Sequence, residues 1–145
     1  MEEKWWLQLQ NTNGVIKEIL ECNEGIERFG LELSEEDVFF LVEQRKDSLQ
    51  QSGRVELGKG ILPKLIFQFC DSPYVDPGNF VELLGQLQEI FYEYKNEFMD
   101  ELSDDDLLEC MEKSFNGVCQ GSVEYLEDTI LETFARAERG RDEWN

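Results

Sequence analysis

The sequence contains no histidine, so imidazole plays no part in its chemistry. Histidine is the usual general base near neutral pH and a common ligand of transition metals. Mechanisms that rely on a Ser–His or Cys–His pair are therefore excluded. No other constellation of catalytic residues stands out. The sequence favours a non-enzymatic protein and leaves the reaction class of an enzyme unspecified.

Closely spaced cysteines are also missing. The four cysteines, Cys22, Cys70, Cys110 and Cys119, include no C-x-x-C pair. A structural zinc site normally takes two ligands from one turn, and no histidine is present to complete a mixed set. A chain of 145 residues has a core large enough to fold without a disulfide scaffold. We expect no metal and no cofactor.

Cys119 is the one cysteine with a candidate chemical role. It lies just before an expected helix start at Ser122, where the helix dipole lowers a thiol pKa. The sequence leaves two interpretations open for Cys119, a reactive thiol or a small residue packed into a tight turn. The other three cysteines adjoin apolar faces and are expected in or near the core.

Long apolar runs are absent too. No window approaches the roughly 18 consecutive apolar residues of a membrane-spanning helix. The first six residues, Met1 to Trp6, lack a basic start followed by an apolar run, so they do not resemble a signal peptide. We expect a cytoplasmic protein with no membrane partner.

Basic residues are scarce. Lys and Arg number 13 against 33 Asp and Glu, which gives a net charge of −20. A field of this sign repels nucleic acid and anionic membranes, favours solubility and steers basic partners toward the surface. We expect no nucleic-acid partner, and an unknown protein partner of basic character fits this charge.

Helical periodicity is what the sequence has in abundance. Capping residues precede the periodic segments at Ser34 and Ser103, and glycines end them at Gly30 and Gly53. The main expected helices cover about residues 15–29, 35–52, 61–70, 77–98, 104–115 and 123–139. The fold class predicted is all-α: a single compact bundle of five or six helices over residues 1–145, with a frayed tail at about 141–145.

The segment over residues 77–98 has the clearest pattern. Its apolar residues alternate spacings of four and three, as in a heptad seam: Phe80, Leu84, Leu87, Phe91, Tyr94 and Phe98. Leu83 and Ile90 broaden this seam into a stripe typical of a globular core. Packing within the bundle is therefore favoured, and a homodimer through the seam is the alternative.

The segment from Gly53 to Gly60 nearly matches the phosphate-binding pattern G-x-x-x-x-G-K-[ST]. Gly60 occupies the hydroxyl position that would hold magnesium, and no buried strand precedes the segment. A glycine-rich connection between helices is the favoured interpretation. Residues 45–64 nevertheless carry five bases and two acids, a local charge of +3. Arg54, Lys59 and Lys64 are candidate anion-binding residues near a helix start, unless they pair with the protein's own carboxylates.

Residues 97–112 contain eight acids and no base. Such a run suggests Ca²⁺ or Mg²⁺ as a ligand, but neither Asp71 nor Asp100 starts a loop with EF-hand spacing. A solvated acidic face is the favoured interpretation, and a divalent cation at this run is left open.

Several segments resemble an uncharacterised bacterial family of small acidic helical proteins, a domain of unknown function. They are residues 60–66 (GILPKLI), 69–74 (FCDSPY), 87–91 (LQEIF), 119–122 (CQGS) and 124–127 (EYLE). The likeness extends from about Leu9 to Ala137. It implies a soluble bacterial protein and transfers no catalytic residue.

Three functions remain as hypotheses. The first is a non-enzymatic, acidic helical protein-interaction domain, suggested by the charge and by Trp5, Trp6 and Trp144 near the ends. The second is a small-anion or phosphate-ligand binding protein or enzyme that uses the segment 53–64. The third is a nucleic-acid mimic. The first hypothesis accounts best for the missing catalytic constellation.

Overall fold

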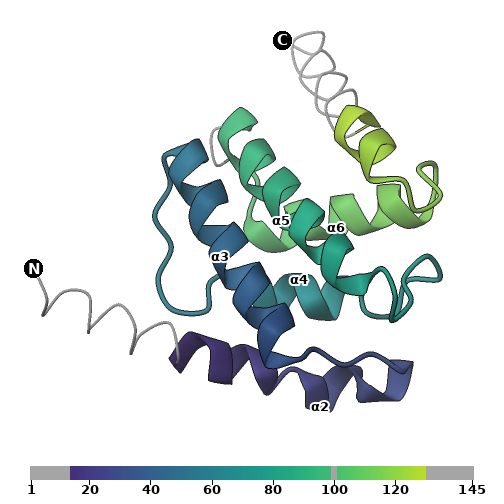
Figure 1. The fold of residues 1–145 in the computed structure, drawn as a ribbon. Helices are drawn as coiled ribbons and strands as arrows, with labels where there is room; N and C mark the ends of the chain where they lie inside the picture. Colours follow the sequence, from purple (N-terminus) through teal and green to yellow (C-terminus); the bar gives the residue numbers. More distant parts are fainter. Residues whose placement is uncertain (1–13, 99–100, 130–145) are drawn as a thin grey trace, which may run out of the picture.

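Every regular element in the described part of the chain is a helix. The computed structural model describes residues 14–98 and 101–129 (Figure 1). Its elements are a helix over residues 14–20, α2 (Asn23–Ile26), the 3-10 helix η1 (Glu27–Phe29), α3 (Glu35–Ser52), α4 (Leu62–Phe69), α5 (Phe80–Glu97), α6 (Asp104–Asn116) and a last helix described over residues 123–129. The all-α bundle is confirmed. Within these residues, no helix has the length and apolar character needed to cross a membrane.

Helix α5 lies at the centre and contacts α3, α4 and α6. The residues of its seam are each 2% exposed or less: Phe80, Leu84, Leu87, Phe91, Tyr94 and Phe98. Burial of each such side chain contributes about 1.5–3 kcal/mol. The seam is therefore buried within the core of one chain, and self-association would need another surface.

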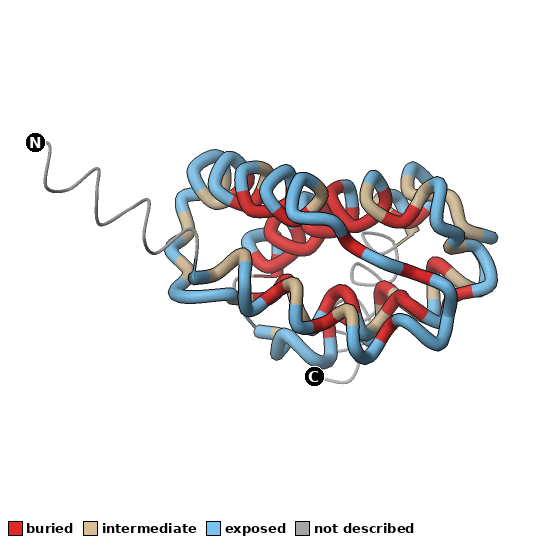
Figure 2. Tube along the Cα trace, turned by 60° about the horizontal axis from the view of Figure 1, so that its bottom comes forward, coloured by how far each residue is buried: buried red, intermediate tan, exposed pale blue. Residues whose placement is uncertain are grey.

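Helix α4 is held at the core by a stripe at helical spacing: Leu62, Leu65, Ile66 and Phe69 are all fully buried. Pro63 occupies the first turn, where its missing N–H leaves no hydrogen bond unmade. Figure 2 shows buried residues on the inward sides of the helices and exposed residues outside. Phe67 falls off the stripe and is 49% exposed, so one apolar side of α4 faces outward.

The predicted helix ends are confirmed at two N-terminal caps, Ser34 and Ser103, and at one C-terminal cap, Gly53. The Ser34 hydroxyl accepts from the Asp37 N–H at 3.0 Å, and the Asp37 carboxylate accepts from the Ser34 N–H at 2.9 Å, a complete capping box. Ser103 caps α6 by accepting from the Asp106 N–H at 3.1 Å. Gly53 ends α3 with φ of 69°, a left-handed conformation that glycine adopts at little cost.

Two expectations about the helices were wrong. The segment expected as one helix over residues 15–29 breaks after residue 20 into α2 and η1. The helix expected over residues 77–98 begins only at Phe80, because the Asp76 carboxylate accepts from the N–H groups of Gly78 and Asn79 in a turn before it. Phe39 and Phe40 lie outside the buried face of α3, since they are 52% and 51% exposed. The predictions for Trp5, Trp6, Trp144 and the tail at 141–145 lie outside the described residues.

Candidate functional site: an acidic groove between two helices

Helices α4 and α6 pack against each other through their apolar sides. The rings of Phe69 and Phe115 meet edge to face, with centroids 5.5 Å apart. Leu108 and Met111 of α6 are buried beside them. This contact fixes the distance between the two helices, so that their outer residues face each other across a surface depression.

This depression, the α4–α6 groove, consists of two adjoining hollows of about 370 and 530 Å³. The hollows share Gln68, Asp105 and Glu112. The full lining is Lys64, Phe67, Gln68, Asp71, Asp105, Leu108, Glu109, Glu112, Lys113 and Asn116. Because hollows of this size fit several side chains of a ligand, the groove is a candidate binding site.

Acids outnumber bases in the groove by four to two. Lys64 pairs with Asp105 at 2.9 Å, and Lys113 pairs with Glu109 at 3.2 Å. Glu112 accepts from the Gln68 amide, and neither Glu112 nor Asp71 forms an ion pair within the described residues. The two lysines are thus already matched, and the groove keeps an excess of negative charge.

Phe67 forms an apolar wall at one end of the groove. Its ring lies against α2, where a Cβ added to Gly25 would stand 2.6 Å from Phe67 Cε1. Glycine at this position therefore lets α2 approach the ring closely, and any side chain would displace it. About half of Phe67 remains open to the groove, so the groove combines an acidic rim with an aromatic contact surface.

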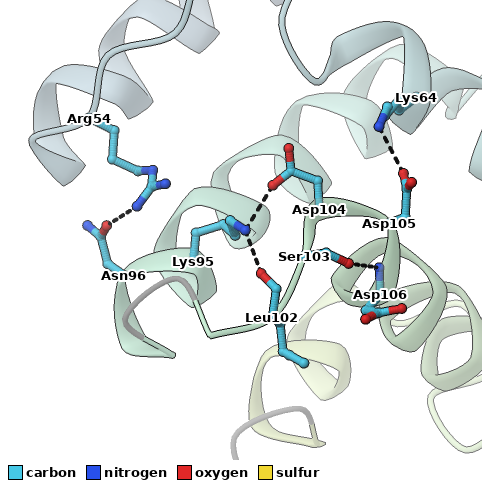
Figure 3. A network of polar contacts seen from close by, with 9 residues as sticks. All are labelled: Arg54, Lys64, Lys95, Asn96, Leu102, Ser103, Asp104, Asp105 and Asp106. Carbon is cyan, nitrogen blue, oxygen red and sulfur yellow. Dashed lines mark hydrogen bonds and ion pairs between the residues drawn. The ribbon is translucent and has the colours of Figure 1, made fainter.

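The three candidate anion-binding residues do not form one site. The Arg54 guanidinium donates to Asn96 Oδ1 at 2.8 Å, whereas Lys64 turns to Asp105. Figure 3 shows these two contacts on opposite sides of the polar network. Hydrogen bonding to Asp105 raises the pKa of Lys64, so this ammonium stays charged and engaged. Lys59 is exposed and does not line the hollow beside Lys64. Anion binding by these residues stays a prediction.

The glycine-rich segment is a folded connection. Glu56 turns inward, where its carboxylate pairs with Arg45 Nε at 2.7 Å and accepts from the Tyr92 hydroxyl at 2.6 Å. Burial and the Glu56 carboxylate raise the pKa of Tyr92, which keeps it a donor. A side chain at Gly60 would collide with Glu56. The space where a phosphate would be cradled is thus occupied by the protein's own carboxylate.

Cys119 is buried, at 4% exposure, and its Sγ lies 3.7 Å from Thr129 Oγ1. The turn that follows has Gln120 and Gly121 at positive φ, and Gly121 packs under Tyr74. These surroundings suit a small residue in a tight turn better than a reactive thiol, because reactive thiols are partly exposed. Reactivity of Cys119 stays a prediction.

The acidic run is divided among separate contacts. Asp104 pairs with Lys95 at 2.9 Å, and the same ammonium donates to the Leu102 carbonyl at 2.6 Å (Figure 3). Asp105 reaches Lys64 on α4. Three acids in the first turn of α6 also complement the helix dipole. Within the described residues, no group of three side chains is arranged to hold a metal ion.

A second acidic feature lies away from the groove, between α5 and the last helix. Partial burial and the carboxylates of Glu127, Glu89 and Glu97 raise the pKa of Glu93 to about 6. The Tyr94 hydroxyl donates to the Glu127 carbonyl nearby. Sequence reasoning missed both the acidic feature around Glu93 and the α4–α6 groove, because each is formed by helices that come together only in the fold. The one sequence feature that could have indicated the groove is the position of Phe67 outside the apolar stripe of α4.

The sequence was compared with protein families, curated proteins and solved structures. No curated protein and no solved structure matches it. A family model matches residues 18–143, which is most of the chain and includes the groove, the 53–60 segment and the cysteine turn. The chain therefore belongs to the family of unknown function DUF6323.

Proposed function

We propose that this protein is a non-enzymatic interaction domain whose α4–α6 groove binds a basic polypeptide segment that carries an apolar residue. The observation that carries the proposal is the groove itself, in which a half-exposed Phe67 stands beside an excess of carboxylates. Interfaces of this kind rely on a buried aromatic anchor with charged groups around it.

Charge complementarity defines the partner. Lys64 and Lys113 are occupied by Asp105 and Glu109, so an incoming lysine or arginine meets Asp71 and Glu112. The net charge of −20 steers basic partners over a longer range. An anionic ligand would be repelled by the same rim, which is why the groove does not support the small-anion hypothesis.

The composition of the groove argues against catalysis. Its lining residues include no hydroxyl or thiol nucleophile, and two of its carboxylates are engaged with lysines. A nucleophile with an adjacent base is the usual minimum for covalent catalysis. Binding is therefore the activity that this arrangement supports best.

We place the protein in the cytoplasm as part of the same proposal. All four cysteines are free thiols, and three of them are buried. Unpaired thiols packed in a core are typical of proteins that fold in a reducing compartment.

The test uses a synthetic amphipathic lysine–leucine peptide and isothermal titration calorimetry. We expect binding that weakens about tenfold in Asp71→Asn/Glu112→Gln, since the two carboxylates left for the partner's bases are removed. Glu43→Gln/Asp47→Asn on α3 is the matched control, because it removes the same charge elsewhere and should bind like the wild type. An equal loss in both double variants would show that only net charge matters and would reject the groove.

The aromatic contact is tested separately with Phe67→Ala. Its control is Phe40→Ala, since Phe40 is exposed to the same extent on α3. We expect Phe67→Ala to weaken peptide binding by about tenfold or more and Phe40→Ala to leave it unchanged. Binding that survives Phe67→Ala would remove the anchor from the proposal.

The nucleic-acid mimic remains an alternative proposal, supported by Glu89, Glu93 and Glu97 at intervals of four residues along α5. The row is short, because eight residues of helix span about 12 Å. Competition between this protein and DNA for a DNA-binding protein is the test. Inhibition that depends on Glu89 and Glu97, and not on Asp71 and Glu112, would favour the mimic over the groove.

A further inference from the structure

The connection between α3 and α4 exposes two apolar side chains almost completely. Val55 and Leu57 are 90% and 87% exposed, which are the highest values among the large apolar residues described. The backbone over residues 54–57 is non-helical, and Glu56 between them turns inward to Arg45 and Tyr92. Val55 and Leu57 therefore form a small apolar projection, here called the 55/57 projection.

The 55/57 projection is held in place by contacts of Arg54 and Glu56. Glu56 is fixed by its ion pair with Arg45 and its hydrogen bond from Tyr92, and Arg54 is bonded to Asn96 on α5. A preorganised loop loses little conformational entropy on binding. Two apolar residues that a protein exposes on a fixed loop indicate a contact surface rather than a flexible tether.

A second apolar surface lies at the start of α3. Ile16 and Leu20 of the first described helix face Phe39 across a hollow of about 650 Å³. Its rim carries Glu35, Glu36 and Lys17, so acids outnumber bases there by two to one. This hollow, here called the α3 groove, is separate from the α4–α6 groove and has room for the two side chains of the 55/57 projection.

Charge makes the two surfaces complementary. The protein repels itself at a net charge of −20, so two copies meet most favourably where a locally basic segment reaches an acidic rim. Residues 45–64 are the basic segment, at +3. Within this segment, Lys59 is exposed and has no ion pair in the described part of the chain. Glu35 and Glu36 are exposed at the rim of the α3 groove.

We propose that the protein associates with a second copy of itself, with the 55/57 projection of one copy in the α3 groove of the other and Lys59 beside Glu35 and Glu36. Burial raises the pKa of the Cys22 thiol and the nearby Lys59 ammonium opposes part of this rise, so the loop ends near the turn that follows the helix carrying Ile16 and Leu20. In Figure 1 the loop and this helix lie on the same side of the molecule. A two-fold axis on that side makes two identical contacts and closes the assembly as a dimer.

Sedimentation velocity over a concentration series, at about physiological ionic strength, tests the proposal. We expect the wild type to dimerise, and Val55→Ser/Leu57→Ser and Phe39→Ser each to raise the dissociation constant by at least about tenfold. Phe40→Ser is the matched control, since Phe40 neighbours Phe39 at equal exposure but does not line the α3 groove. It should dimerise like the wild type.

A swap of charges between Lys59 and Glu36 distinguishes this specific contact from nonspecific association. Lys59→Glu should weaken the dimer, and the added change Glu36→Lys should restore it, because the opposite charges then meet again. Circular dichroism of each variant checks the fold, which these exposed positions should leave intact. Phe67→Ala should leave the dimer unchanged, so loss of the dimer and loss of peptide binding are distinguishable.

Three results would overturn the proposal. The first is a wild type that stays monomeric at every concentration. The second is a dimer that survives both Val55→Ser/Leu57→Ser and Phe39→Ser. The third is a Phe40→Ser variant that loses the dimer as fully as Phe39→Ser does.

Discussion

Glu56 stabilises the connection between α3 and α4 through a single carboxylate. It neutralises Arg45, whose side chain is only 8% exposed, and accepts a hydrogen bond from the buried Tyr92. A buried guanidinium without a partner is costly, because its desolvation is no longer offset. Removing one member of this ion pair should therefore lower the free energy of unfolding, because the other charge is left buried without a partner.

We predict that Glu56→Ala lowers the free energy of unfolding by about 3 kcal/mol, because Arg45 and Tyr92 both lose their partner. Urea denaturation measures this change. Glu43→Ala is the control, since its ion pair with Lys46 is exposed on both sides and should contribute less than about 1 kcal/mol. Equal losses in the two variants would contradict the role of Glu56.

We predict that Glu93→Gln stabilises the protein at neutral pH. The pKa of Glu93 is raised to about 6, so the folded protein holds this proton more tightly than the unfolded chain. Stability from Glu93 is therefore complete below its ordinary pKa and is lost as pH rises toward 6. The groups that face it are Glu89, Glu97 and Glu127.

Thermal unfolding of wild type and Glu93→Gln at several pH values between about 4 and 7 measures the difference. The advantage of the variant should grow as pH rises through this range and then level off. Glu101→Gln, on an exposed residue outside this cluster, should show no such trend. A constant difference between wild type and Glu93→Gln would contradict the raised pKa.

At the scale of the element, the local signals in the sequence predicted helix ends well. The N-caps at Ser34 and Ser103 and the stop at Gly53 could all be predicted, because capping is a contact between near neighbours in the chain. The exposure of single aromatic residues could not be predicted from the sequence. Phe39, Phe40 and Phe67 sit in apolar stretches, and only the placement of other helices decides which face of each stretch is covered.

We predict that Ser103→Ala loosens the first turn of α6 and with it one wall of the α4–α6 groove. The serine hydroxyl accepts from the Asp106 N–H, and loss of such a cap costs about 1 kcal/mol. Hydrogen exchange should accelerate at the first turn of α6 and stay unchanged in α3. Unchanged exchange in α6 would show that the cap is not needed there. Ser103→Asp, which restores a capping oxygen, should recover the protection.

At the scale of the whole molecule, the sequence predicted the fold class, the acidic character and the membership of an uncharacterised family. It did not predict the candidate site. The α4–α6 groove joins residues about 40 positions apart, such as Lys64 and Asp105, and such distances are set by packing. The same packing placed Arg54 and Lys64 on different partners, although they are close in sequence.

The described surface has distinct regions. The α4–α6 groove offers acids and an aromatic ring, the 55/57 projection offers apolar residues beside a cation, and the α5 face offers the carboxylates of Glu89, Glu93 and Glu97 among neutral polar groups. Because net charge acts on all of them equally, only the groups within each region distinguish one partner from another. The proposed function therefore depends on binding at one defined region.

The most direct test is an amide chemical-shift titration of the isotope-labelled protein with the lysine–leucine peptide. We expect the largest shifts on α4 and α6, around Phe67 and Glu112. Shifts that centre instead on α5 around Glu93, or that spread evenly over the acidic surface, would contradict the proposed function.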